Sequence, residues 1–212
     1  YENIWKLNAG HLLKINLPLN EKSNDFISKP WWELKDIINL DSVNLISNEI
    51  EAKNLIEREL KQSVQYQSKA DVNVTSFLSG GIDSSLITAL LQSSRSTKIN
   101  TYTVGFENEN YNEAPFAKTI AGYLGTSHNE LILTNEDALS IVPLLSNFYS
   151  EPFADPAAIP TYLMCKAAAN SGFKVALSGD GADELFGGYN RYTLAPKVWK
   201  TTGFISKSQR IV

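Results

Sequence analysis

Two polar, glycine-rich stretches contain the residue types that could bind an anion together with a metal ion. Residues 79–85 read SGGIDSS, and residues 178–184 read SGDGADE. Glycines let the backbone approach an anion closely, and successive amides, with the start of a following helix, point partial positive charge at it. Serine hydroxyls add donors, and carboxylates supply the oxygen ligands that Mg²⁺ prefers. Together these stretches have the composition of a phosphate-binding site.

The first stretch differs from the common nucleotide-binding loops. It lacks the Gly-Lys-Ser/Thr ending of a Walker A loop, and it does not match the GxGxxG dinucleotide pattern. Because the loop contains no lysine, we expect a divalent metal to neutralise bound phosphates. Asp83 supplies one candidate ligand, and Asp183 of the second stretch supplies another.

Strands and helices alternate around these stretches. Hydrophobic patterns predict strands and helices in turn; the strands cover residues 72–78, 98–106, 128–134 and 173–179, and the helices cover 41–67, 83–93, 112–124, 136–149 and 160–170. Asp41 and Ser42 are expected to cap the first helix, and Gly125 is expected to end the helix over 112–124. The alternation predicts an α/β fold with an open parallel sheet and helices on both faces.

The first 40 residues have a different pattern. Two short apolar stretches within residues 4–17 predict a β-hairpin or strand pair that turns at residues 8–10. Residues 19–30 are polar and predict a loop that ends at the aromatic pair Trp31 and Trp32. We therefore expect a domain boundary near residue 40, with a short β segment before the parallel sheet.

The polar stretches follow predicted strands, and this position decides between two interpretations. By itself, Gly80-Gly81 before a helix is also typical of a strand-to-helix turn, and SGDGADELFGG is also typical of a surface loop. Ligands of open parallel sheets bind outside the carboxyl ends of the strands. Residues 79–85 follow the first predicted strand, and residues 178–184 follow the fourth predicted strand. Val104 to Phe106 form the end of the second predicted strand. Their joint position favours an anion site.

Composition excludes several classes of partner. The net charge is −4 and the basic residues are scattered, which argues against a nucleic-acid or membrane-surface protein. The single cysteine, Cys165, excludes an internal disulfide framework, and no apolar run is long enough to span a bilayer. We expect a cytoplasmic protein. Because the sequence begins with Tyr rather than Met and stops without a closing element, we also expect a piece of a longer chain.

Several of these segments resemble a known family. LSGGIDSS resembles the pyrophosphate loop of the N-type ATP pyrophosphatases, which have an adenine nucleotide alpha hydrolase-like fold. TYTVGF, NEAPFAKTIAGYLGTSHNEL, EPFADPAAIPTYLMCKAA and KVALSGDGADELFGGYNRY resemble the synthetase domain of glutamine-dependent asparagine synthetases of the B type, in that family's order and spacing. IWKLNAGHLLKINL and PWWEL resemble the tail of the family's glutaminase domain, a class II glutamine amidotransferase. The resemblance implies that residues 1–40 are this tail and that residues 41–212 are the first part of the synthetase domain.

The resemblance also implies site residues and cofactors. It implies ATP and Mg²⁺ as cofactors, with Mg²⁺ on Asp83 and Asp183, and it places Asp180 where the family has a catalytic acid, often Glu. Asp83 and Asp183 count with Asp180 as catalytic candidates, and Glu151 and Asp155 are candidates near the acceptor amino acid. The implied ATP-binding residues are Leu78, Ser79, Gly80, Gly81, Asp83, Ser84, Ser85, Val104, Ser178 and Gly179.

The implied enzyme is an AMP-forming carbon–nitrogen ligase. The side-chain carboxylate of aspartate would attack the α-phosphorus of ATP, releasing pyrophosphate, and ammonia from glutamine would convert the acyl-adenylate to asparagine and AMP. These small molecules are the expected partners, and a homodimer is a candidate assembly. The family's N-terminal cysteine and a downstream lysine have no counterpart among these residues, so we expect the isolated chain to bind ATP without completing synthesis.

Two alternatives remain open at this stage. Relatives of the same superfamily amidate or cyclise other carboxylates, including sugars, peptides and β-lactam precursors. A nucleotide-binding module without catalysis is the other alternative. The presence of both Asp83 and Asp183 argues against a degenerate site.

Overall fold

The computed structural model describes residues 2–15, 26–41 and 45–201, which form two compact units, Tyr1–Ile56 and Glu57–Val212. We describe each unit by itself. In the described ranges, no helix is both long and apolar enough to cross a bilayer. The assignment of residues 1–40 to a glutaminase domain and of 41–212 to a synthetase domain stays a prediction.

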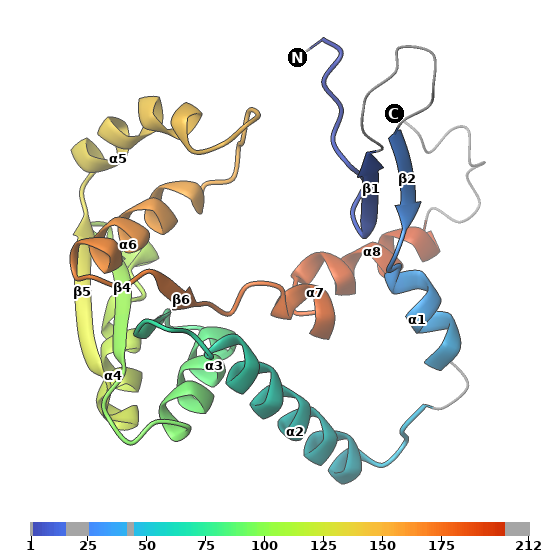
Figure 1. The fold of residues 1–212 in the computed structure, drawn as a ribbon. Helices are drawn as coiled ribbons and strands as arrows, with labels where there is room; N and C mark the ends of the chain where they lie inside the picture. Colours follow the sequence, from blue (N-terminus) through green and yellow to red (C-terminus); the bar gives the residue numbers. More distant parts are fainter. Residues whose placement is uncertain (1, 16–25, 42–44, 202–212) are drawn as a thin grey trace. The chain divides into compact units, whose positions relative to one another are not determined.

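A four-stranded parallel sheet forms the centre of the second unit (Figure 1). Its strands are β3 (Val74–Phe77), β4 (Asn100–Phe106), β5 (Ser127–Leu133) and β6 (Val175–Leu177), in the spatial order β5-β4-β3-β6. β3 pairs with β4 on one side, where Ser76 lies opposite Thr101, and with β6 on the other, where Ser76 lies opposite Leu177. The predicted open parallel sheet is confirmed.

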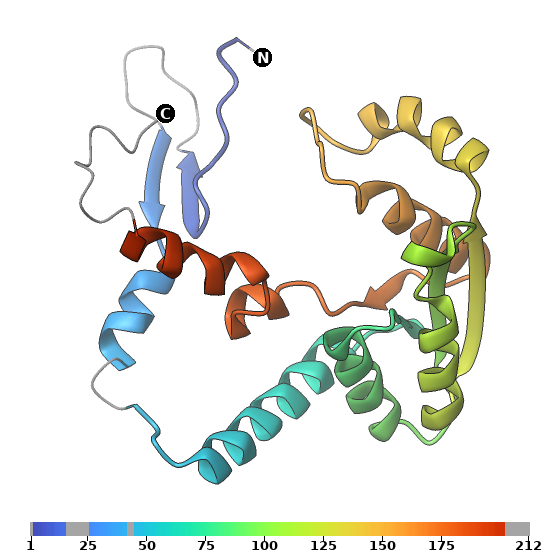
Figure 2. The ribbon, with the colours of Figure 1, turned by 180° about the vertical axis from the view of Figure 1, so that it is seen from behind.

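Helices cover both faces of this sheet, as predicted. α4 (Ala114–Leu124) contacts β4 and β5 and lies in front of the sheet in Figure 2, whereas α6 (Ala158–Asn170) contacts the same strands and lies in front in Figure 1. α3 (Ile82–Ser93) packs on β3 and against α4. Right-handed crossovers explain the two layers, because the chain moves one way across the sheet through α3 and α4 and returns through α6.

Local residue chemistry sets the ends of the helices. The Asn112 Oδ1 atom accepts from the Ala114 amide at the start of α4, and Gly125 ends this helix in the left-handed conformation, with φ of 72°. Thr134 and Asp137 form a reciprocal capping box at the start of α5 (Asn135–Ile141). The helix predicted over 136–149 divides at Pro143, where a 3₁₀ segment, η2 (Val142–Asn147), replaces the α-helix.

The core of the second unit consists of two apolar clusters. One joins Val64, Leu91, Ile99 and Leu177, with Val74, Ile87 and Leu90 packed against it. The other joins Leu78, Ala117 and Ala121, with Ile120 at its edge. Buried hydroxyls lie between them, since the Ser76 Oγ and Thr88 Oγ1 atoms are 2.9 Å apart and Thr75 Oγ1 donates to the Asn100 carbonyl at 2.6 Å. These contacts fix β3, which leads directly into the first polar stretch.

The helix predicted over 41–67 is shorter than expected. α2 (Glu49–Gln67) begins after Asn48, whose Oδ1 atom accepts from the Glu51 amide. The expected cap at Asp41 is therefore wrong, because Asp41 ends another helix, α1 (Leu34–Asp41); Ser42 lies outside the described residues. The sequence analysis missed α1 because it began the first helix at Asp41 and predicted no element between Trp32 and that residue.

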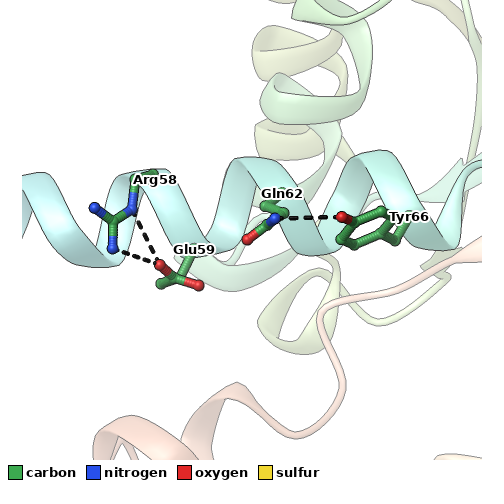
Figure 3. A network of polar contacts seen from close by, with 4 residues as sticks. All are labelled: Arg58, Glu59, Gln62 and Tyr66. Atoms are coloured by element: carbon green, nitrogen blue, oxygen red, sulfur yellow. Dashed lines mark hydrogen bonds and ion pairs between the residues drawn. The ribbon is translucent and has the colours of Figure 1, made fainter.

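Polar contacts along α2 lie at its surface. Figure 3 shows Arg58 donating to Glu59 through Nε and Nη2, and Gln62 Nε2 donating to the Tyr66 hydroxyl at 3.3 Å. A 2.5 Å bond from Lys61 to Glu57 lowers the pKa of that carboxyl. Exposed pairs of this kind contribute little to stability. Burial of Val64 is what attaches the second half of this helix to the sheet.

In the first unit a strand pair is present, but its two strands are not the two stretches that the sequence predicted. β1 (His11–Ile15) pairs antiparallel with β2 (Phe26–Pro30), and residues 4–8 form no strand. The turn at residues 8–10 exists, with Gly10 at φ of 68°, and the Gly10 carbonyl accepts from the amides of Trp31 and Trp32. The stretch predicted as a loop therefore supplies β2, because this backbone contact returns the chain alongside β1.

Truncation of a core leucine tests this packing. Leu91 has 0% of its surface exposed, whereas Leu86 on the same helix is 43% exposed. We expect Leu91→Ala to lower the free energy of unfolding by about 2–5 kcal/mol, because it leaves a cavity, and Leu86→Ala to lower it by less than about 1 kcal/mol. Urea unfolding of both variants measures this difference. Equal losses would contradict the assignment of Leu91 to the core.

Candidate functional site

The site lies next to β3, where the path of the chain across the sheet reverses its direction. From β3 the chain proceeds to β4 and β5 on one side, and it then returns to β6 on the other side. The loops that follow β3 and β6 therefore leave adjacent strands at the same edge. They touch, because a Cβ atom added at Gly179 would lie 2.7 Å from the Ser84 amide nitrogen and 3.0 Å from the Asp83 Cβ atom. The two predicted polar stretches are thus in direct contact.

The loop after β3 is held by its own serines. Ser84 Oγ accepts from the Ser79 amide at 3.0 Å and lies 2.7 Å from Ser79 Oγ, while the Gly81 amide donates to Ser79 Oγ at 3.1 Å. Gly81 is the N-cap of α3 with φ of −80° and ψ of 160°, and no side chain caps that helix. Asp83 is consequently not a capping residue, and it lies in the first turn.

Leu78 anchors the start of this loop to β4. Its amide donates to the Tyr102 carbonyl at 2.9 Å, and its carbonyl accepts from Thr103 Oγ1. The Leu78 side chain is only 1% exposed and packs against Ala117 and Ala121 of α4. The first amides of the loop are therefore presented from a fixed backbone position.

The loop after β6 leads into two helices that the sequence analysis did not predict, of which the first is short. Gly181 adopts φ of 90° before α7 (Ala182–Phe186), and Gly187 adopts φ of 70° after it, so α7 lies between two left-handed glycines. α8 (Asn190–Thr201) follows. Gly188 lies against the Asp183 carboxylate, at a distance that a Cβ atom would not permit. A glycine at position 188 is thus what gives this carboxylate its room.

Two cavities open at this edge of the sheet. The larger has a volume of 870 Å³ and extends from the loops to α6, where Pro160, Thr161 and Met164 line it. The smaller, which we call the acidic cavity, has a volume of 380 Å³. Carboxylates dominate its wall, and none of the described residues that line it is a lysine or arginine; the acidic residues are Asp83, Asp155, Asp180, Asp183 and Glu184.

Most of the residues predicted from the sequence line these cavities. The larger cavity includes Leu78, Ser79, Ser84, Val104, Ser178, Gly179 and Asp180. The acidic cavity includes Ser79, Gly81, Asp83, Ser84, Gly179, Asp180 and Asp183. Gly80 and Ser85 are not among the residues that line these two cavities. The Gly80 amide donates to Glu113, which lines the larger cavity, and Ser85 Oγ donates to the Gly81 carbonyl. Ser178 Oγ donates to the Asp180 carboxylate at 2.9 Å, which orients it between the cavities.

A hydrogen-bonded pair sets the charge at the rim of the acidic cavity. The Tyr189 hydroxyl donates to Glu184 Oε1 at 2.8 Å. This bond lowers the pKa of the Glu184 carboxyl and raises the pKa of the Tyr189 phenol. The Arg191 guanidinium lies 4.1 Å from the centre of the Tyr189 ring, which places a positive charge beside this pair. Sequence reasoning gave no role to Glu184, the last residue of the second polar stretch, or to Tyr189, which lies five positions after that stretch.

The carboxylates in the acidic cavity can be compared with the ligands that the expected Mg²⁺ requires. Among the described residues, no cluster of three or more His, Cys, Asp or Glu side chains has a metal-binding arrangement. Asp83 and Asp183 line the same cavity, however, and Mg²⁺ is usually held by one or two carboxylates, with phosphate and water oxygens completing its shell. Two carboxylates in one cavity therefore fit a magnesium ion that arrives with a phosphate ligand.

Comparison with known proteins identifies relatives of this domain. The sequence model of the asparagine synthase family matches residues 55–210. Asparagine synthetase (glutamine-hydrolyzing) 1 of Bacillus subtilis is 43% identical over 61% of this chain and 20% of its own length. The asparagine synthetase (glutamine-hydrolyzing) of Asparagus officinalis is 32% identical over 67% of this chain and 26% of its own length. Amidase chry2 of Gibberella zeae is 30% identical over 91% of this chain and 30% of its own length. The chain thus spans less than a third of the length of these relatives.

Two glycine substitutions test the contact between the loops. We expect Gly179→Ala to lower the free energy of unfolding by about 1–3 kcal/mol, because its Cβ atom would meet the backbone at Ser84. Gly122→Ala is the matched control, since Gly122 lies within α4 with no atom within 4 Å of an added Cβ. This change should raise the free energy of unfolding by about 0.5–1 kcal/mol.

Urea unfolding measures both effects, and hydrogen exchange at the Ser84 amide localises the first one. A Gly179→Ala protein as stable and as slowly exchanging as the wild type would show that the two loops are not packed together as described.

Proposed function

Since the chain belongs to the asparagine synthase family, we propose that it carries the ATP-pyrophosphatase site of a glutamine-hydrolysing asparagine synthetase. The site would transfer AMP from ATP to the side-chain carboxylate of aspartate and would then admit ammonia. The observation that supports this most directly is the meeting of two glycine-rich loops, each with a carboxylate in one acidic cavity, at the edge where parallel sheets bind ligands.

ATP fits the larger cavity in size and in lining. Its 870 Å³ lies within the usual range for ligand pockets, and its wall is largely apolar toward α6, where a base would lie. We assign Leu78 and Val104 to the base, Ser178 and Gly179 to the rest of the pocket wall, and the loop of Ser79 to Ser85 to the phosphates. Backbone amides and serine hydroxyls of this loop would bind the pyrophosphate leaving group.

Mg²⁺ is the second cofactor of this proposal. Asp83 and Asp183 would hold it, because both carboxylates line the cavity beside the phosphate loop. When bound, Mg²⁺ neutralises charge that develops on a departing pyrophosphate. None of the described residues in that cavity wall supplies a lysine or arginine for this purpose.

The chemistry needs no protein nucleophile. A carboxylate oxygen of aspartate attacks the α-phosphorus, the bond to the bridging oxygen breaks, and pyrophosphate leaves with the electron pair. Ammonia then attacks the acyl carbon, AMP departs, and the amine proton is lost to yield asparagine. Asp180 lines both cavities and is hydrogen-bonded by Ser178, so we assign it to the first step. Asp155 lines the acidic cavity, which supports its assignment to the acceptor amino acid.

The source of ammonia and the assembly extend the proposal to the whole protein. Residues 1–40 would be the end of a class II glutamine amidotransferase domain that releases ammonia from glutamine, and residues 41–212 would be the first part of the synthetase domain. We propose small molecules as the partners, a homodimer as the assembly and the cytoplasm as the compartment. The similarity to amidase chry2 supports a second candidate, transfer to a different carboxylate at the same ATP site.

Substitution of the proposed metal ligand tests the ATP site. We expect Asp83→Asn to weaken binding of ATP in the presence of Mg²⁺ by about tenfold or more, because one of two carboxylate ligands is lost. Binding of ATP in EDTA should change much less. Titration calorimetry with and without Mg²⁺ measures both. Formation of AMP by the full-length protein, with aspartate against a panel of other carboxylates, identifies the acceptor.

Asp71→Asn is the matched control, since Asp71 lies in the loop before β3, at the opposite edge of the sheet. It makes the same change of charge and should leave ATP binding unchanged. Unaltered Mg²⁺-dependent binding in Asp83→Asn would contradict the metal assignment.

A further inference from the structure

An acidic side chain is hydrogen-bonded to the proposed phosphate loop. The Gly80 amide donates to Glu113 Oε2 at 3.3 Å, and Glu113 lines the larger cavity together with Ser79 and Ser84. Glu113 immediately precedes α4 and comes from outside the loop. Neither the predicted site residues nor the proposed reaction gives this carboxylate a role.

Packing brings Glu113 to this amide. A Cβ atom at Gly80 would lie 3.0 Å from the Phe116 Cβ atom and 3.5 Å from that of Glu113, so the loop and the start of α4 are closely packed at this glycine. The start of α4 is fixed in turn by Asn112, whose Oδ1 atom accepts from Ala114 and occupies the space beside Gly105. The end of β4 therefore determines where the Glu113 side chain reaches.

The other amides at the start of the loop are also engaged, but by neutral partners. The Ser79 amide donates to Ser84 Oγ, and the Gly81 amide donates to Ser79 Oγ. Only the Gly80 amide donates to a charged group among these neighbouring amides. A phosphate oxygen that binds the Gly80 amide must displace this carboxylate, because two anions on one donor repel each other.

We propose that Glu113 occupies the position of a phosphate oxygen on the Gly80 amide in the nucleotide-free protein, and that ATP and pyrophosphate bind by displacing it. This inference rests on the proposed function. The bond is long and its surroundings are exposed, as expected for a contact that must break in each catalytic cycle. Return of the carboxylate to Gly80 would promote release of pyrophosphate, the product that otherwise stays on the loop.

Two substitutions at Glu113 separate this role from the alternatives. We expect Glu113→Ala to tighten binding of ATP and of inorganic pyrophosphate by about two- to fivefold, the effect of removing one competing hydrogen bond. Glu113→Gln should tighten both as well, because the amide keeps an acceptor but loses the charge. The tightening should occur both with Mg²⁺ and in EDTA, and pyrophosphate should dissociate more slowly by a similar factor. Titration calorimetry and stopped-flow measurements on the protein as expressed from its gene provide these values.

Glu109→Gln is the matched control, since Glu109 begins a 3₁₀ turn four positions earlier and lines neither cavity. It removes the same charge and should leave both affinities unchanged. Equal tightening in Glu109→Gln would attribute the effect to long-range charge and would overturn the proposal.

Three further results would overturn it. Weaker binding in both Glu113 variants, only with Mg²⁺, would make Glu113 a metal ligand. Weaker binding in Glu113→Ala with normal binding in Glu113→Gln would make it a support for the loop backbone. If the wild type and both Glu113 variants bind ATP equally well, the role of Glu113 is contradicted and the proposed function is not. If none of these proteins, including the wild type, binds ATP, the proposed function is contradicted as well.

Discussion

The site depends on one close approach, that of the Gly179 backbone to the first turn of α3. A Cβ atom at this position would lie 2.7 Å from the Ser84 amide nitrogen, so only glycine permits the contact. The approach is available because β3 pairs with both β4 and β6, which brings loops separated by about a hundred residues to one edge. The shared cavities, the opposing carboxylates and the ordered serines all follow from this arrangement.

Electrostatics then limits what such a site can hold. The acidic cavity has carboxylates on several sides, and its described lining includes no basic side chain. A polyphosphate could bind there only with cations and with backbone amides as donors. The bond from the Gly80 amide to the Glu113 carboxylate follows the same electrostatic rule, since an amide donor without a phosphate ligand attracts the nearest carboxylate of the protein. Affinity for nucleotide would then depend on exchange between internal and external anions rather than on a lysine.

Much of the fold was predictable from sequence because both faces of the sheet are covered. Apolar runs such as residues 173–179 indicated parallel strands, although only Leu177 of β6 is buried, and Gly125 correctly marked the end of α4. The predictions that were wrong involve contacts distant in sequence. β1 pairs with β2 across a polar stretch, since Trp31 and Trp32 donate to the Gly10 carbonyl. The cap of α2 is Asn48, because Asp41 belongs to the helix before it.

By itself, the sequence determined the residue types of the site and the edge at which they lie. Hydrophobic period and glycine position are local properties, so SGGIDSS and SGDGADE could be placed after strands without coordinates. Only the tertiary structure decided which side chains meet. Glu113, Gly188 and Tyr189 contact the site through packing of α4 and α7 that no local pattern encodes, and Gly80 packs against α4 with its amide bonded to Glu113. Contacts of this kind depend on helix and strand placement to within an ångström, and that placement is set by the whole core.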